Sequence, residues 1–176
     1  AQVCLDMAVE YAKLRVQFGR QIGSFQAIKH KCADMLLEVE SARSAAYFAA
    51  WTAEDRPAEL PMIASLAKAF CSEAYAHTAA ENIQVHGGIG FTWEHDAHLY
   101  YRRARSSEAL FGTPTEHWDV VAGHLLAAVA EILEVDATGM TGAENLNEVG
   151  NWDSLAVITF VAMADSDLDT LVEAEK

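Results

Sequence analysis

The chain has 176 residues, of which 52 % are hydrophobic, and a formal net charge of −14. This composition excludes an intrinsically disordered chain and is sufficient for a globular core. No run of about 18 apolar residues occurs, so the sequence predicts no membrane-spanning segment. Because the negative charge repels nucleic acids and anionic membranes, we expect neither as a partner.

The charge is unevenly distributed along the chain. Residues 1–118 carry 11 Lys and Arg against 14 Asp and Glu, whereas residues 119–176 carry 1 against 12. The net charges of the two parts are therefore −3 and −11. This asymmetry indicates two parts with different partners, and the acidic part is suited to a basic protein surface.

The spacing of apolar residues predicts an all-α chain without a β pattern. The expected helices cover residues 1–17, 24–52, 62–85, a stretch from about 94 onward, 114–135 and 154–164. Ser24 is the predicted N-cap of the second helix. Thr113 and Glu116 form a predicted capping box, with Pro114 at the favoured first helical position.

The cysteine and histidine positions argue against metal sites and disulfides. Cys4, Cys32 and Cys71 are widely spaced in apolar helical segments, which is typical of buried, reduced thiols in a cytoplasmic protein. His95 and His98 lack the further ligands that a metal ion needs. The first residue is not Met and lies in a helical pattern, so we expect a piece of a longer protein.

Three stretches combine glycines with groups that suit a nucleotide. "RVQFGRQIGSFQ", residues 15–26, offers a permanent cation, aromatic faces and an amide. "QVHGGIGF", residues 84–91, has three glycines in four positions, more than a helix stop requires. "FGTPTEHW", residues 111–118, supplies a helix N-terminus whose free N–H groups suit phosphate or a flavin edge. Each stretch alone also fits an ordinary helix end.

In their order and spacing, these stretches resemble the C-terminal helical domain of acyl-CoA dehydrogenases over residues 1–118. "TWEHDAHLYYRRAR", residues 92–105, resembles the actinobacterial members. The resemblance implies an up-down helical bundle, an FAD cofactor and a homodimer or homotetramer. It also implies α,β-desaturation of an acyl-CoA or carrier-bound acyl thioester, with a separate electron-transfer partner.

The resemblance implies FAD contacts for ten residues. Those in the first stretch are Arg15, Gln17, Phe18 and Gln26. Those that would lie against the adenosine or pyrophosphate part of an FAD held largely by a partner subunit are Gln84, Val85, Gly87 and Gly88. Those near the FAD at the final turn are Thr113 and Thr115.

The position of the catalytic base departs from one branch of the family. That branch carries a catalytic Glu where this chain has Phe111, and a phenyl ring cannot remove a proton from the α-carbon of a thioester. Glu108 is three residues away, and we interpret it as part of a solvated helix face. Two alternatives stay open: the base lies on the helix that leads into residue 1, or the protein is a non-catalytic helical scaffold.

The acidic part, residues 119–176, contains "GNWDSL" at 150–155. A helix predicted to begin at Ser154 after a polar loop resembles an acyl carrier protein that is cut short. The resemblance implies 4′-phosphopantetheine on Ser154, added by a phosphopantetheinyl transferase, where the helix dipole favours the phosphodiester. The alternatives are that Ser154 is an ordinary N-cap or that this part only mediates interactions. No linker separates it from residues 1–118.

Overall fold

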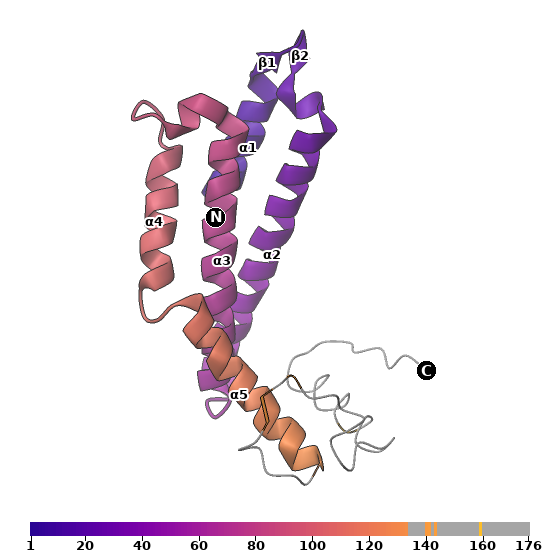
Figure 1. Cartoon of the computed structure of the whole chain (residues 1–176), viewed down its shortest axis with the longest axis vertical. Coiled ribbons are helices and arrows are strands. Elements are labelled where there is room, and N and C mark those ends of the chain that lie inside the picture. The colour runs from indigo at the N-terminus through magenta and orange to yellow at the C-terminus, as the bar shows by residue number, and fades with distance from the viewer. Residues whose placement is uncertain (134–139, 142, 144–158, 160–176) are drawn as a thin grey trace. The chain divides into compact units, whose positions relative to one another are not determined.

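The structure is a computed structural model that describes residues 1–133, 140, 141, 143 and 159. In chain order the elements are α1 (Gln2–Leu14), β1 (Val16–Gln17), β2 (Arg20–Gln21), η1 (Ile22–Ser24), α2 (Gln26–Asp55), α3 (Leu60–His86), η2 (Gly87–Phe91), α4 (Ala97–Ala109) and α5 (Pro114–Leu133). Figure 1 shows α1 to α4 running alternately up and down. The predicted all-α, up-down class is confirmed.

The chain divides into two compact units. Residues 1–119 form one compact unit, and the residues from 120 onward form a second. The predicted helix at 154–164, with Ser154, lies outside the described residues. Within the described part, no helix combines the length and apolar character needed to cross a bilayer.

The helix α3 lies at the centre of residues 1–119, in contact with α1, α2 and α4. Its buried residues do not form a single stripe, because Ala67, Ala69, Ala74 and Ala76 are separated by two, five and two positions. A helix with buried positions around its circumference must be enclosed by neighbours. The small alanine side chains let these neighbours approach closely.

Polar contacts fix the antiparallel register of α2 and α3. Lys31 of α2 forms an ion pair with Glu81 of α3. Farther along α2, the Glu38 carboxylate lies 2.7 Å from His77 Nδ1 and accepts a hydrogen bond of 3.4 Å from the Thr78 hydroxyl. Because the residue number falls on α3 as it rises on α2, the two helices cannot slide without breaking both contacts.

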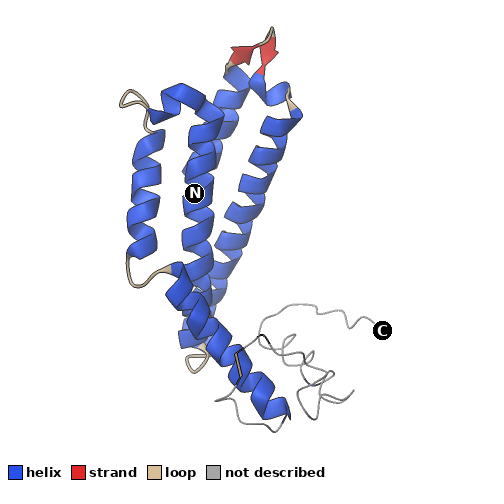
Figure 2. Cartoon of the chain, viewed as in Figure 1, coloured by secondary structure: helices blue, strands red, loops and turns tan. Residues whose placement is uncertain are grey.

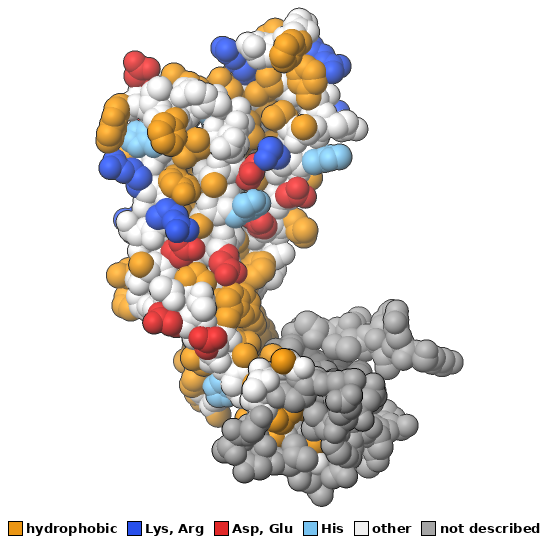
Figure 3. All heavy atoms as spheres, viewed as in Figure 1, with side chains coloured by type: hydrophobic (Ala, Val, Ile, Leu, Met, Phe, Trp, Pro, Cys, Tyr) orange, Lys and Arg blue, Asp and Glu red, His pale blue; other side chains and the backbone are white. Residues whose placement is uncertain are grey.

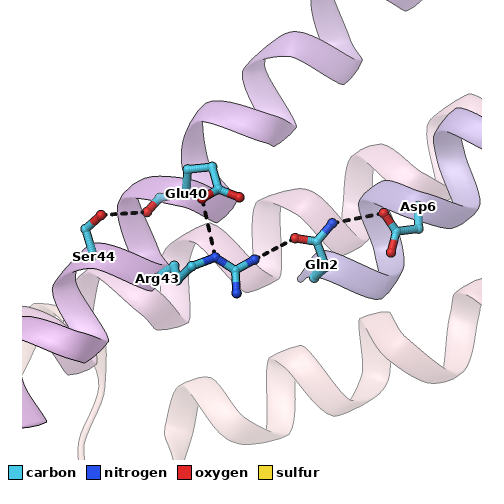
Figure 4. A network of polar contacts seen from close by, with 5 residues as sticks. All are labelled: Gln2, Asp6, Glu40, Arg43 and Ser44. Atoms are coloured by element: carbon cyan, nitrogen blue, oxygen red, sulfur yellow. Dashed lines mark hydrogen bonds and ion pairs between the residues drawn. The ribbon is translucent and has the colours of Figure 1, made fainter.

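A chain of polar side chains joins the start of α1 to the middle of α2 (Figure 4). Arg43 donates to Gln2 Oε1 at 2.7 Å, and Gln2 in turn donates to Asp6 at 2.9 Å. Arg43 also pairs with Glu40, whose backbone carbonyl accepts from the hydroxyl of Ser44. All of these side chains are exposed, so the network orients α1 on α2 and adds little to stability.

The main difference from the predicted fold is a hairpin between α1 and α2, shown as arrows in Figure 2. The predicted first helix stops early because Arg15 has an extended backbone (φ −69°, ψ 125°). Gln17 then pairs with Arg20 across a two-residue turn. The turn residues, Phe18 and Gly19, both have positive φ, as a type I′ turn requires. Strands of two residues are too short to show an alternating pattern.

The predicted start of the second helix is also wrong. Ser24 lies in the 3₁₀ turn η1, where its hydroxyl donates to the carbonyl of Gln21 at 2.7 Å. The helix α2 begins at Gln26, with Phe25 as an N-cap that makes no side-chain capping bond. Ser24 therefore stabilises a turn and not a helix start, because a serine hydroxyl can hydrogen-bond the backbone in either setting.

The predicted capping box at the start of α5 is confirmed. The Thr113 N–H donates to Glu116 Oε2 at 2.7 Å, and the Glu116 N–H donates to the Thr113 hydroxyl at 3.3 Å. Hydrogen bonds from the Thr113 backbone and then its hydroxyl lower the pKa of the Glu116 carboxyl. The start of α5 is therefore specified by its own sequence.

The cysteines are free, as expected, but not all are buried. Cys4 is fully buried, whereas Cys32 and Cys71 are half-buried. Burial raises the pKa of each of the three thiols. The prediction of three buried thiols is therefore correct for Cys4 alone.

The core beneath the hairpin end depends on Met35. This side chain is fully buried with Leu5, Val39 and Val85. We expect Met35→Ala to lower the free energy of unfolding by about 2–5 kcal/mol, because it leaves a cavity between three helices. Leu37→Ala, at an exposed position two residues away, serves as the control and should change it by less than about 0.5 kcal/mol. Equal losses in urea denaturation would contradict this packing.

Candidate functional site

A cavity of about 640 Å³ lies where α1, the hairpin and the end of α3 meet. Five of the ten residues implied as FAD contacts line it: Arg15, Gln17, Val85, Gly87 and Gly88. The remaining lining residues are Tyr11, Ile22, His86 and Ile89, so no carboxylate contributes to the wall. Figure 3 shows basic and hydrophobic side chains gathered at this end of the molecule. We call this space the hairpin-end cavity.

The backbone of Arg15 is held on both sides. Its N–H donates to the carbonyl of Tyr11, and its own carbonyl accepts from the N–H of Ile22, both at 2.8 Å. Its side chain is exposed and makes no ion pair with any described residue. An anchored, unpaired guanidinium at a cavity wall can bind an anion bidentately.

The three glycines after α3 differ in whether the described residues require a glycine at their positions. Gly87 has φ +64° and ψ −142°, a conformation that only glycine adopts readily. A Cβ on Gly90 would lie 2.8 Å from His86 Cβ and 3.1 Å from the carbonyl oxygen of Ile83. Gly88 has no positive φ, and a Cβ there would meet nothing within 4 Å. Within the described chain, nothing requires Gly88 to lack a side chain.

His86, the last residue of α3, is buried in the wall of the hairpin-end cavity with 5 % of its surface exposed. Its ring contacts Tyr11 and His95, each at a centroid distance of 4.2 Å. Its Nδ1 lies 2.8 Å from the carbonyl oxygen of Asn82. Burial lowers the pKa of the imidazole, the bond to Asn82 opposes this, and His95 lowers it further. His86 therefore stacks on Tyr11 and contacts His95 at a tilt of 46°.

Three of the implied contacts do not line the hairpin-end cavity. Phe18 projects from the hairpin turn with 92 % of its surface exposed and touches Phe25 edge-on at 6.1 Å. Gln26 and Gln84 are exposed at the ends of α2 and α3. These side chains are free to meet a molecule outside this chain.

The two threonines lie at the other end of α3. Thr113 and Thr115 line a second cavity of about 380 Å³, together with Glu73, Arg105 and Glu108. The hydroxyl of Thr113 is engaged in the capping box, donating to Glu116 at 2.9 Å. The hydroxyl of Thr115 makes no hydrogen bond to a described side chain, so Thr115 is the one free to bind a ligand.

Phe111 is displayed at this end in a strained conformation. Its φ is +63°, an outlier for a bulky residue, yet 86 % of its surface is exposed. Two tethers hold the loop: Lys68 donates to the carbonyls of Glu108 and Gly112 at 2.8 and 2.6 Å, and His117 Nε2 donates to the Phe111 carbonyl at 2.9 Å. Strain held by surrounding contacts is typical of functional loops.

The length of α3 separates the two cavities. Glu73, in the wall of the second cavity, and His86, in the wall of the hairpin-end cavity, are 13 residues apart on this helix. At 1.5 Å per residue, this places them about 20 Å apart. The ten implied residues therefore form two groups and not one site.

Sequence reasoning missed four residues that shape these cavities: Tyr11, Lys68, His86 and His95. Tyr11 and Lys68 lie on predicted helices outside any motif, and their contacts join segments far apart in sequence. Only His86 carried a signal, because it immediately precedes the glycines. No three His, Cys, Asp or Glu side chains in the described part of the chain lie close enough together to hold a metal ion.

Comparison with known proteins identifies the family. A sequence profile described as "Acyl-CoA dehydrogenase, C-terminal domain" matches residues 1–126. The chain belongs to the acyl-CoA dehydrogenase family. Acyl-CoA dehydrogenases are flavoprotein oxidoreductases, for which FAD is the expected cofactor.

Individual acyl-CoA dehydrogenases agree with this assignment. Acyl-CoA dehydrogenase IpdE2 of Mycobacterium tuberculosis is 49 % identical over 116 residues, which cover 66 % of this chain and 35 % of the relative. Butyryl-CoA dehydrogenase of Megasphaera elsdenii has a TM-score of 0.68 at 35 % identity, covering 71 % of this chain and 32 % of that one. The prolyl acyl carrier protein oxidase AnaB has a TM-score of 0.67 at 31 % identity, covering 70 % and 32 %. The chain thus spans about a third of the length of these acyl-CoA dehydrogenase relatives.

The glycine turn gives a test of this geometry. We expect Gly90→Ala to lower the free energy of unfolding by about 1–3 kcal/mol, because the new methyl group overlaps His86 Cβ. Gly88→Ala is the matched control: it meets open space and should leave the free energy of unfolding unchanged within about 0.5 kcal/mol. Chemical denaturation of both variants measures this, and a Gly88→Ala loss equal to that of Gly90→Ala would refute the assignment.

Proposed function

We propose that this chain is the FAD-contacting helical part of an acyl thioester dehydrogenase. The observation that carries the proposal is Gly88, a glycine that none of the described residues requires, in a carboxylate-free cavity beside Arg15, which forms no ion pair with them. FAD supplies the hydride acceptor for α,β-desaturation. The substrate class is an acyl-CoA or a carrier-bound acyl thioester, and a separate electron-transfer partner reoxidises the flavin.

The hairpin-end cavity has groups that fit the diphosphate part of FAD. Arg15 provides a fixed positive charge, and Gln17 provides an amide beside it. Gly87 and Gly88 let the backbone approach a ligand without a side chain between them. A neighbouring carboxylate would repel phosphate, and none lines this wall.

The distance between the two groups favours an assembly in which each chain contacts two FAD molecules. The end with Thr115 would contact one FAD, and the end with Arg15 and Gly88 would contact the FAD of a partner subunit. About 20 Å of α3 separates the two cavities, from Glu73 to His86. A homodimer, or a tetramer built from it, satisfies this arrangement.

The described residues near Phe111 offer no free catalytic base. Glu108 is the nearest carboxylate in sequence, and it forms an ion pair with Arg105. For the enzyme, we propose a base outside residues 1–176, on a helix before residue 1. The alternative function is a non-catalytic scaffold, which the phenyl ring at position 111 favours. Flavin absorbance in the full-length protein that bleaches on addition of acyl-CoA would support the enzyme, and flavin that does not bleach would support the scaffold.

The FAD contacts can be tested with paired arginine variants of the full-length protein. We expect Arg15→Gln to weaken FAD binding about tenfold to a hundredfold, because it removes a charge-assisted hydrogen bond. Arg20→Gln is the control: Arg20 is on the same hairpin but lies over the ring of Phe25 and outside the cavity. Gly88→Ala should weaken FAD binding without a loss of stability. Unchanged FAD affinity in both Arg15→Gln and Gly88→Ala, measured by flavin fluorescence, would refute this site.

The carrier hypothesis for residues 119–176 rests on the sequence around Ser154. AnaB is named as an oxidase of a carrier-bound prolyl group, which favours a carrier-bound thioester as one substrate class. We propose that Ser154 carries 4′-phosphopantetheine and holds the thioester on the same chain.

Modification of Ser154 is directly measurable. Incubation of the protein with a phosphopantetheinyl transferase and CoA should add the mass of one phosphopantetheine to Ser154. Ser154→Ala should gain no mass under the same conditions. If mass spectrometry finds the unmodified chain in both cases, the residue is an ordinary cap and the carrier proposal is withdrawn.

A further inference from the structure

His86 presents a free nitrogen to the hairpin-end cavity. Its Nδ1 lies 2.8 Å from the Asn82 carbonyl oxygen, which can only accept, so Nδ1 carries the proton. Its Nε2 makes no hydrogen bond to the described residues. The fully buried polar side-chain atoms that lack a partner there are Glu59 Oε2 and Asn82 Oδ1, and His86 Nε2 is not among them. Because His86 lines the cavity, Nε2 opens into it.

The two neighbouring histidines differ in their hydrogen bonds. His95 Nδ1 accepts a hydrogen bond of 3.1 Å from the N–H of Ala97, at the start of α4. The His86 ring lies 4.2 Å from that of His95, centroid to centroid. His86 can take a proton at Nε2 and keep the bond from Nδ1 to the Asn82 carbonyl, so this nitrogen is available to an anion.

The charges around His86 oppose this proton until an anion is present. From α1 the ring faces Tyr11, and Arg15 at the end of α1 lines the same cavity. Gln17 of β1 is uncharged, and His95 faces the ring from the segment before α4. Since no carboxylate lines the cavity, an anionic ligand there would supply the compensating negative charge.

We propose that His86 is a direct contact for the diphosphate of a ligand in the hairpin-end cavity, and that binding takes up one proton from solvent at Nε2. The inference rests on the proposed function in that FAD is the ligand. The protonated ring donates through Nε2 to a phosphate oxygen and through Nδ1 to Asn82. Its charge lies against the face of Tyr11, which stabilises a cation.

The sign of the pH effect follows from this linkage. An anion raises the pKa of His86 in the complex above that in the free protein, so affinity is higher at low pH and falls as pH rises through the pKa of the complex. One linked proton changes the affinity by up to about tenfold per pH unit. FAD and ADP-ribose are suitable probes, because their diphosphates do not titrate near neutrality.

The experiment uses the full-length protein with FAD and with ADP-ribose between pH 6 and pH 8.5. Calorimetry in buffers of different ionisation enthalpy should show uptake of about one proton, and NMR should show the His86 Cε1–H titration moving to higher pH on binding. His86→Asn keeps an amide donor for the Asn82 carbonyl but cannot titrate, so its affinity should be independent of pH over this range. His30→Asn, at an exposed position on α2, should behave like the unsubstituted protein.

Each outcome separates this inference from the proposed function. FAD binding with no proton uptake and no shift in the NMR titration would overturn the role of His86 and leave the FAD site standing. Failure of FAD to bind the unsubstituted protein at any pH would overturn both. Because the NMR titration uses the unsubstituted protein, a folding defect in His86→Asn cannot obscure the answer.

Discussion

The enclosure of α3 by three other helices is the constraint on which the rest of this structure depends. Alanines around its circumference allow α1, α2 and α4 to approach, and the ion pair of Lys31 with Glu81 and the contact of Glu38 with His77 set its register against α2. Both cavities include residues of this one helix, Glu73 in one and His86 in the other. The residues that shape them, Lys68 and His86, are therefore positioned by the central packing and not by the loops that they contact.

The two ends of α3 use different physical means to hold a site. At the hairpin end, the chain turns through glycines, and the ring of His86 contacts those of Tyr11 and His95. At the other end, an exposed Phe111 keeps a positive φ because Lys68 and His117 bind the carbonyls around it. In the first case glycines replace side chains, two of them for reasons within the chain: Gly87 for its positive φ and Gly90 for its contact with His86. In the second, one side chain is presented outward at a cost of about 1–2 kcal/mol.

The sequence predicted features that are encoded locally and missed features that depend on contacts across the fold. The capping box of Thr113 and Glu116 could be predicted because both partners lie within one helical turn. The hairpin at Phe18 and Gly19 could not, because strands of two residues leave no periodic signal. Of the ten residues that the family motifs implied as FAD contacts, five line one cavity.

What the motifs could not supply was the reason for each residue. The three glycines after α3 are equivalent in the sequence, and only the backbone angles and neighbouring atoms distinguish them. The same holds for Tyr11, which contacts His86 across 75 positions of sequence without any shared motif. Ring stacking between helices leaves no pattern in either helix.

The length of α3 also constrains the proposed assembly. In the proposed assembly, each copy would present two FAD-contacting surfaces at a spacing fixed by this one helix. A symmetric pair would then need a twofold axis that places the hairpin end of one copy within reach of the threonines of the other. Insertion or deletion of a helical turn in α3 would keep the residues of each cavity but change the spacing between the cavities, so that the two copies could no longer align both surfaces.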